Sequence, residues 1–310
     1  TLREYQRRGV DWLYWMSQHN LGVILADDMG LGKTLQFLAL EAVERAEKPR
    51  AASLVVVPTT VVGNWEKEAK KFVPSLKVLV HHGAGRLVGD RLARALVQHD
   101  LVIPSYGTIP RDLKDFSQIT WHRVCLDEAQ QIKNAQTKTA KAVRALPAQH
   151  RLALTGTPVE NRLLELRSIL DFCNPGILGS ASFFKNHFAK AIEESEDEVK
   201  IEQLRNLTAP FILRRLKTDP AISPDLPDKM ETVLTVTMSP EQAALYTAFV
   251  QDVTSQIADS QGIGRKGIVL ASLTKIKQIC NHPAHFLADG SGITLKGRHR
   301  SGKVEKLMEL

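Results

Sequence analysis

The feature that most constrains the fold is a series of short apolar runs that alternate with helical patterns over the first 170 residues. Runs of this kind are typical of parallel strands that are buried on both faces. The segments between them carry apolar residues at helical spacing, as Leu35, Leu38, Ala39 and Ala42 do. The alternation predicts an α/β fold, in which helices flank a parallel sheet joined by right-handed crossovers. Strands are expected at residues 22–26, 54–57, 77–80, 101–103, 124–126 and 152–154.

Composition limits the class of protein. The chain has 310 residues, of which 43% are hydrophobic and 24% are charged, as is usual for globular proteins. No apolar stretch approaches the roughly 20 residues that span a bilayer, so we expect no membrane association. The three cysteines, Cys125, Cys173 and Cys280, form no CxxC pair and favour a reducing compartment. We therefore expect a cytoplasmic protein, associated with the nucleoid in a prokaryote, or a nuclear one in a eukaryote. The net charge of +7 permits a polyanionic partner without identifying it.

A glycine-rich loop follows the first predicted strand and opens a helix. Its sequence, Asp27-Asp28-Met29-Gly30-Leu31-Gly32-Lys33-Thr34, matches the GxxxxGK[ST] pattern except that Asp27 replaces the first glycine. Glycines allow backbone N–H groups to surround phosphates, and the helix N-terminus adds the positive end of its dipole. Lys33 would reach the β- and γ-phosphates, and the Thr34 hydroxyl would hold Mg²⁺. The loop predicts a site for a nucleoside triphosphate and its magnesium ion.

An acidic pair ends another predicted strand. Asp127 and Glu128 directly follow the apolar run at residues 124–126. Asp127 is suited to bind Mg²⁺, directly or through water, and Glu128 to accept a proton from an attacking water. Such a pair alone is most often a solvated strand end. Together with the upstream loop it predicts hydrolysis of the triphosphate, with Lys33, Asp127 and Glu128 as the catalytic residues.

The pattern changes beyond residue 170. Asn174-Pro175-Gly176 forms a turn signal, and no further strand–helix repeat follows it. Ser239-Pro240-Glu241-Gln242 has the form of a capping box that opens a helix. We predict three regions: a nucleotide-binding lobe at residues 1–170, a mainly helical appendage at 171–289, and a connector at 290–310. The connector, rich in Gly and Ser, is expected to lead into a further domain.

The order of these motifs resembles that of the Swi/Snf-type ATPases of helicase superfamily two, and the resemblance covers nearly the whole chain. Asp in place of the first loop glycine is usual in that family, and the DEAQ box at residues 127–130 resembles its bacterial and archaeal members. Two later boxes are specific to the family: Phe211-Ile212-Leu213-Arg214-Arg215 and Gln278-Ile279-Cys280-Asn281-His282-Pro283. The other matching segments are Leu2-Arg3-Glu4-Tyr5-Gln6, Val57-Pro58-Thr59, Asn64-Trp65-Glu66-Lys67-Glu68, Ser105-Tyr106-Gly107 and Leu154-Thr155-Gly156-Thr157-Pro158, with Glu160-Asn161 after it.

The resemblance implies a first RecA-like lobe with a helical protrusion, ATP and Mg²⁺ as cofactors, and hydrolysis coupled to translocation on duplex DNA. It implies remodelling of protein–DNA complexes, with DNA-bound proteins as further partners. Gln6 would read the adenine, and Asp27 to Thr34 would bind the phosphates and metal. Gln130, Thr155, Gly156 and Thr157 would couple the nucleotide state to the DNA. The expected contacts to the DNA backbone are Thr59, Ser105 and Tyr106, which carry little sequence information.

The family's later motifs, including the arginines that a second RecA-like lobe supplies, do not follow in this chain. Such an arginine is worth about 10³–10⁵ in rate. We therefore expect this chain alone to bind ATP but to hydrolyse it weakly. Two alternatives remain: an RNA-directed superfamily-two ATPase, which the DEAQ box and the Ile-Cys-Asn-His-Pro box disfavour, and a nucleotide- and DNA-binding module without turnover.

Three side-chain groups have competing interpretations. Cys280, His282 and His285 include favoured zinc ligands, but no fourth ligand is evident, so we expect a structural role. Trp65 is expected in the core rather than stacked on a base. For Arg214 and Arg215 a phosphate contact and an intramolecular ion pair remain equally open.

Overall fold

The computed structural model describes residues 2–158, 162–219, 222, 230–258 and 262–310, so Glu160-Asn161 lie outside it. It divides into two compact units, Thr1–Pro227 and Asp228–Leu310.

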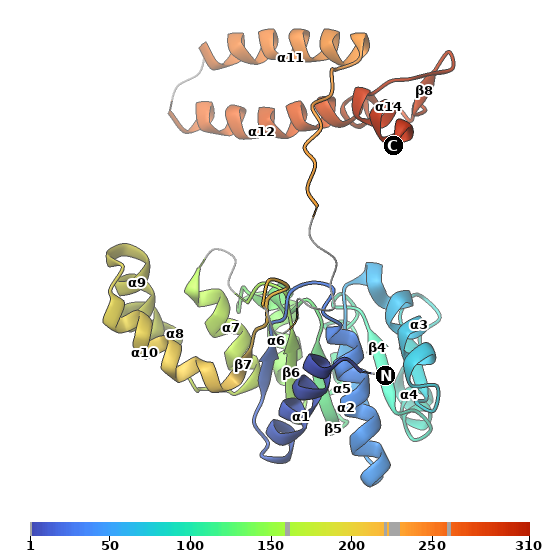
Figure 1. Ribbon diagram of the computed structural model, residues 1–310, viewed down its shortest axis with the longest axis vertical. Helices are drawn as coiled ribbons and strands as arrows, with labels where there is room; N and C mark the ends of the chain where they lie inside the picture. The colour runs from blue at the N-terminus through green and yellow to red at the C-terminus, as the bar shows by residue number, and fades with distance from the viewer. Residues whose placement is uncertain (1, 159–161, 220–221, 223–229, 259–261) are drawn as a thin grey trace. The chain divides into compact units, whose positions relative to one another are not determined.

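The first unit contains a seven-stranded parallel sheet (Figure 1). Its strand order is β3-β4-β2-β5-β6-β1-β7. All six strands predicted from the apolar runs are present, which confirms the α/β fold. The strands are β1 (Val23–Leu25), β2 (Ser53–Val56), β3 (Val78–His81), β4 (Leu101–Pro104), β5 (Trp121–Leu126), β6 (Ala148–Leu154) and β7 (Ile212–Leu213).

Helices cover both faces of this sheet (Figure 1). Along β1, Val23 and Leu25 pack into one hydrophobic core, whereas Ile24 packs into the other. Burying each such side chain contributes about 1.5–3 kcal/mol relative to leaving it exposed. The core with Val23 includes α1 (Glu4–Gln18), α2 (Lys33–Glu47) and α3 (Val62–Phe72). The core with Ile24 includes α4 (Gly89–Leu96), α5 (Leu113–Phe116), α6 (Lys138–Ala145) and α7 (Leu163–Cys173).

Strand β7 is a feature that the sequence pattern did not predict. Ile212 and Leu213 pair in parallel with Ile24 and Leu25 of β1. Two residues are too few for a recognisable strand pattern, and the strand depends on β1 as its neighbour. Because β7 returns to the sheet, residues 171–219 belong to the first compact unit, which differs from the domain boundary expected at residue 170.

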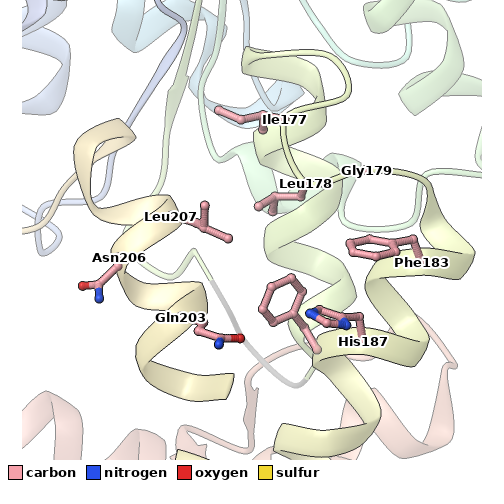
Figure 2. Close-up of a pocket in the computed structure, with 9 residues that line it drawn as sticks. Ile177, Leu178, Gly179, Phe183, His187, Gln203, Asn206 and Leu207 are labelled. Carbon is pink, nitrogen blue, oxygen red and sulfur yellow. The ribbon is translucent and has the colours of Figure 1, made fainter. Parts of the chain in front are cut away.

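A helical protrusion lies between α7 and β7 and encloses an apolar groove of about 570 Å³. Figure 2 shows Leu207 and Phe183 on opposite sides of this groove. The rings of Phe183 and His187 stack with their centroids 4.9 Å apart. The protrusion consists of α8 (Ala181–Phe184), the π-helical turn η3 (Lys185–Ala189), α9 (Lys190–Ser195), α10 (Glu198–Thr208) and η4 (Ala209–Phe211).

The second unit is mainly helical and contains a small hairpin. The predicted capping box is confirmed: Ser239 Oγ accepts from the Gln242 amide at 3.1 Å, and Gln242 Oε1 accepts from the Ser239 amide at 3.1 Å. The expected connector at 290–310 instead contains an antiparallel hairpin and a helix. The elements are α11 (Pro240–Ala258), α12 (Gly262–Asn281), α13 (Pro283–Leu287), β8 (Thr294–Leu295), β9 (Arg298–His299) and α14 (Gly302–Glu309). Across the described parts of both units, no helix is sufficiently long and apolar to cross a bilayer.

Candidate nucleotide-binding site

The glycine-rich loop connects β1 to α2 and forms one wall of a cavity of about 340 Å³. Gly30 and Gly32 adopt φ values of 84° and 79°, a left-handed backbone that glycine adopts without strain. A Cβ atom on Gly32 would lie 2.6 Å from Gln6 Nε2, so a side chain at position 32 would displace the Gln6 amide from its present place. The cavity is lined by Met29, Gly30, Gly32, Lys33, Thr34, Glu68, Asp127 and Glu128. The structure thus brings together the predicted phosphate loop and the predicted acidic pair.

Lys33 lies at the start of α2 with its side chain folded over the loop. Its Nζ donates to the carbonyl oxygens of Asp27 at 2.6 Å and Asp28 at 3.3 Å. Burial lowers the pKa of Lys33 below its ordinary value, and the nearby carboxylates, led by Glu128, oppose this shift. A phosphate in the cavity would offer this ammonium a charged partner in place of two neutral carbonyls.

Asp127 and Glu128 follow β5 at the carboxyl end of the sheet. Asp127 Oδ2 accepts a hydrogen bond from Trp65 Nε1 at 2.7 Å, and Oδ1 accepts from the Glu128 amide at 3.0 Å. Burial raises the pKa of Asp127, and the hydrogen bond from Trp65 partly offsets this effect. Glu128 has a φ of 49°, which is strained for a residue with a side chain. Strain of this kind concentrates at functional sites.

Hydrogen bonds connect Glu128 to the segment after β6. Gln130 Nε2 donates to Glu128 Oε2 at 2.7 Å, and Gln130 Oε1 accepts from Thr155 Oγ1 at 2.8 Å. The Thr157 amide then donates to Thr155 Oγ1 at 3.1 Å. Gly156 lies against the phosphate loop, since a Cβ there would be 3.3 Å from Met29 Cγ. The four residues predicted to couple the nucleotide to the DNA therefore form a continuous path from the acidic pair.

Gln6 is placed beside the loop by a hydrogen bond to the backbone of Leu31, a loop residue. Gln6 Nε2 donates to the Leu31 carbonyl at 3.3 Å, and Gln6 Oε1 accepts from the Arg3 amide at 3.0 Å. Leu31 itself is fully buried, so any contact from this residue to a nucleotide is limited to its backbone. Reading of the adenine by Gln6 remains a prediction.

Asp27 differs from its expected position. Its carboxylate is fully buried and forms an ion pair with Arg215, whose Nε donates to Asp27 Oδ1 at 2.9 Å. Arg215 also donates to Gln36 Oε1 at 2.6 Å. A buried carboxylate requires such a partner, so the side chain of Asp27 fastens the loop to the segment after β7 and does not face the cavity. Of the two interpretations left open for Arg215, the structure supports the intramolecular ion pair.

Two of the three residues predicted to contact DNA are buried. Ser105 Oγ is hydrogen-bonded to Thr108 Oγ1 at 2.8 Å, and Tyr106 Oη donates to the Asp127 carbonyl at 2.7 Å. Both side chains therefore have internal partners, and the side chain of Tyr106 supports the acidic pair through the Asp127 carbonyl. Thr59, in the turn η1 (Thr59–Val61), is exposed and stays a candidate contact.

Helix α3 contributes two residues whose roles the sequence did not reveal. Trp65 is buried, as expected, but its indole N–H reaches Asp127. Glu68, one turn further along α3, lines the cavity. Both roles depend on how α3 packs. Trp65 and Glu68 are three positions apart on a helix that begins soon after β2, so they lie on the same face of α3. This spacing is the signal in the sequence that could have indicated their shared position near the cavity.

The donor atoms around the cavity suit magnesium. Thr34, whose side chain carries a hydroxyl, lines the same cavity as the acidic residues Asp127, Glu128 and Glu68. An all-oxygen set is the chemistry that Mg²⁺ prefers, and Mg²⁺ commonly uses one or two carboxylates together with substrate phosphates. The residues present therefore fit a nucleotide-bound Mg²⁺ ion.

Comparison with known proteins assigns the family. The model of the SNF2-related domain matches residues 5–285. The chain belongs to the SNF2-related domain family. YwqA of Bacillus subtilis is 44% identical over 311 residues, which cover 100% of this chain and 34% of that protein. The TATA-binding protein-associated factor MOT1 of Saccharomyces cerevisiae is 36% identical over 315 residues, covering 93% of this chain and 17% of MOT1.

A solved SNF2 structure supports the same assignment. The SWI2/SNF2 ATPase core of Sulfolobus solfataricus, in complex with double-stranded DNA, is 44% identical with a TM-score of 0.69. The match covers 100% of this chain and 63% of that one. This SNF2-related chain thus spans about a third or less of the two relatives above, and its sheet is the RecA-like lobe of the family fold.

The Cys280–His285 segment of this SNF2-related chain has the geometry of a structural element. His282 caps α13: its Nδ1 accepts from the Ala284 amide at 3.1 Å, and its Nε2 lies 3.3 Å from the Ile293 carbonyl. Both ring nitrogens therefore have backbone partners, in keeping with the structural role expected for this segment.

Proposed function

We propose that this chain is the ATP-binding motor lobe of a DNA-dependent ATPase that translocates on duplex DNA and remodels protein–DNA complexes. One observation carries the proposal: the phosphate loop faces Asp127 and Glu128, and Glu128 is connected through Gln130 to Thr155. A site that only binds ATP would not need a carboxylate, such as that of Glu128, to accept a proton from an attacking water. The family assignment and the DNA-bound Sulfolobus core support the choice of ATP and duplex DNA.

In the proposed mechanism the chain's own residues bind and orient ATP. Lys33 exchanges its carbonyl partners for the β- and γ-phosphates, and backbone N–H groups at the start of α2 hold the same phosphates. Thr34 and Asp127 would hold Mg²⁺, which would neutralise charge on the phosphates when bound. Glu128 accepts a proton from the attacking water, and Gln130 fixes the orientation of the Glu128 carboxylate. The chain of hydrogen bonds from Glu128 through Gln130 to Thr155 and Thr157 couples the state of the nucleotide to the DNA-binding side of the lobe.

The DNA contact is proposed to involve the backbone of the duplex. Thr59 is the exposed candidate on this lobe, and its hydroxyl suits a phosphate contact. Contacts of this kind read little sequence and weaken as salt concentration rises. We further propose that a second RecA-like lobe in the longer protein supplies the arginines that complete the ATP site. The protein would act where its DNA lies, which is the nucleoid in a prokaryote or the nucleus in a eukaryote.

The test is steady-state ATP hydrolysis by the full-length protein that contains this chain. It is measured at a fixed salt concentration without nucleic acid and with duplex DNA, single-stranded DNA or RNA. Stimulation chiefly by duplex DNA is expected. Stimulation by RNA would contradict the proposed partner and leave the ATP site in place. Binding of ATP without hydrolysis under any of these conditions would contradict the motor and indicate a binding module.

A further inference from the structure

Trp65 connects three parts of the proposed ATP site. It lies on α3, it packs edge-on against Phe37 of α2 with ring centroids 5.6 Å apart, and its Nε1 donates to Asp127. Helix α2 begins with Lys33 and Thr34, and Asp127 follows β5. The indole is 2% exposed, so bulk water does not compete for its N–H group.

The hydrogen bond from Trp65 fixes the plane of the Asp127 carboxylate. Oδ2 is held by the indole at 2.7 Å, and Oδ1 is held by the Glu128 amide at 3.0 Å. An ionised carboxylate offers about four lone-pair sites, so two donors still leave acceptor sites on both oxygens. Asp127 is therefore held in one orientation with lone pairs remaining for a metal ion or a metal-bound water.

Trp121 shows that a buried tryptophan does not need a carboxylate partner. Its side chain is fully buried, and its Nε1 donates to the Phe116 carbonyl at 3.1 Å. A buried indole N–H has to find some acceptor, and a backbone carbonyl is sufficient. Packing in the core does not by itself require that an indole N–H meets a carboxylate. The pairing of the Trp65 N–H with an acid at the phosphate cavity therefore indicates a role beyond filling the core.

We propose that Trp65 is a positioning residue that orients Asp127 for the nucleotide-bound magnesium ion. The proposal rests on the assignment of Asp127 as a magnesium ligand under the proposed function. Partners of this kind, which hydrogen-bond to metal ligands, typically contribute about 10–100-fold to metal affinity. Trp65 does not line the cavity and reaches it through its hydrogen bond to Asp127, so loss of the N–H group weakens the contribution of the metal and leaves metal-free nucleotide binding intact.

The experiment measures the dissociation constant of a fluorescent ADP analogue with this chain, once with Mg²⁺ and once with EDTA. The dissociation constant in EDTA divided by the dissociation constant in Mg²⁺ gives the contribution of the metal to binding. Trp65→Phe keeps an aromatic ring against Phe37 and removes the N–H group. It is expected to lower the ratio by about 10-fold while the constant in EDTA is unchanged. Trp121→Phe, the matched control, removes a buried indole N–H outside the cavity and is expected to leave the ratio unchanged.

Asp127→Asn separates failure of this proposal from failure of the proposed site. An unchanged ratio in Asp127→Asn would contradict the assignment of Asp127 as a magnesium ligand. A lowered ratio in Asp127→Asn together with a wild-type ratio in Trp65→Phe would overturn the role of Trp65 alone. In the double variant, Trp65→Phe is expected to add no further loss, because the two residues act through one contact. Additive losses would contradict the proposal.

Discussion

The two ends of β5 carry acidic clusters with opposite character. Near its beginning, the fully buried Arg123 forms ion pairs with Glu41 and Glu44, and His122 Nε2 lies 2.7 Å from Glu44 Oε2. Just after its end, Asp127 and Glu128 line the phosphate cavity. The first cluster contains its own cationic partner for the acids. The second faces space that a nucleotide and a metal ion can fill.

The pKa shifts follow this difference. Burial would raise the pKa of Glu44, but the hydrogen bonds and charges of His122, Arg123 and Ser17 lower it well below its ordinary value. For Asp127, burial raises the pKa and the available partners do not reverse the shift. A carboxyl group whose pKa is perturbed and that lines a cavity is a candidate functional group.

Close approach of acids is therefore a poor guide to function in this molecule. Ligand atoms of Glu41, Glu44 and His122 lie within 4.8 Å of one another, near enough for a metal ion. Arg123 already bonds to both glutamates, with a distance of 2.8 Å to Glu44 Oε2. The buried cluster is a structural ion-pair network, whereas the cavity at the opposite end of the strand is the proposed chemical site.

The largest expected effect separates activity from stability at the cavity. Glu128→Gln removes the proposed proton acceptor and is expected to slow DNA-stimulated ATP hydrolysis by about 10²–10⁴-fold. The free energy of unfolding should change by no more than about 0.5 kcal/mol, as for a substitution outside the core. Steady-state hydrolysis by the full-length protein and urea unfolding of this chain measure the two quantities. A variant that kept most of its activity would exclude Glu128 as the base.

At the beginning of β5 a substitution is expected to lower stability and to leave nucleotide binding intact. Arg123→Met removes the fully buried guanidinium that pairs with both Glu41 and Glu44, leaves Arg45 as the remaining arginine partner of Glu41, and should lower the free energy of unfolding by about 3–5 kcal/mol. Urea unfolding measures this loss, with Glu128→Gln as the matched control from the other end of the strand. Below the unfolding transition, nucleotide affinity should be retained. A loss under about 1 kcal/mol would mean that the cluster is not the structural anchor described above.

A smaller effect concerns the acid sensitivity of the buried cluster. His150 accepts from Arg123 Nε at 2.8 Å, and burial with the charge of Arg123 lowers the pKa of His150 to about 3. The unfolded chain, with an ordinary histidine pKa near 6.5, binds this proton first, so stability falls as the pH drops from about 6.5 towards 3. Glu44 adds a loss below its ordinary pKa, because its folded pKa is lowered.

Substitution of His150 isolates its contribution to the pH dependence of the unfolding free energy. His150→Gln removes the titrating ring and should flatten the pH dependence of the unfolding free energy between pH 6.5 and 4.5, by up to about 1.4 kcal/mol per pH unit. Urea unfolding at several pH values in this range measures the slope for both proteins. Parallel curves would show that His150 does not titrate in the expected window.

The features predicted from sequence are those that a local pattern specifies. Strands β1 to β6 each contain a short apolar run, and the phosphate loop is defined by Gly30, Gly32, Lys33 and Thr34 in one short segment. Asp127 and Glu128 follow an apolar run directly. Each of these signals lies within a few residues of the chain, so a single sequence is sufficient to find it.

The features that were missed depend on contacts between distant segments. Strand β7 needs β1, the side chain of Asp27 is taken by Arg215, and Tyr106 is turned inward to the Asp127 carbonyl. The partners of Arg123 lie about 80 positions earlier in the chain, at Glu41 and Glu44. No spacing rule predicts such pairs, because only the packed sheet brings them together.

Calorimetric titration of a non-hydrolysable ATP analogue with Mg²⁺ tests the assignment of the cavity most directly. It compares this chain with its Lys33→Ala variant. The cavity at the carboxyl end of β5 predicts binding by the wild-type chain and a loss of about 10-fold or more in affinity on removal of the ammonium. Equal affinity in the two proteins, or no binding by the wild-type chain, would contradict the assignment of this cavity as the ATP site.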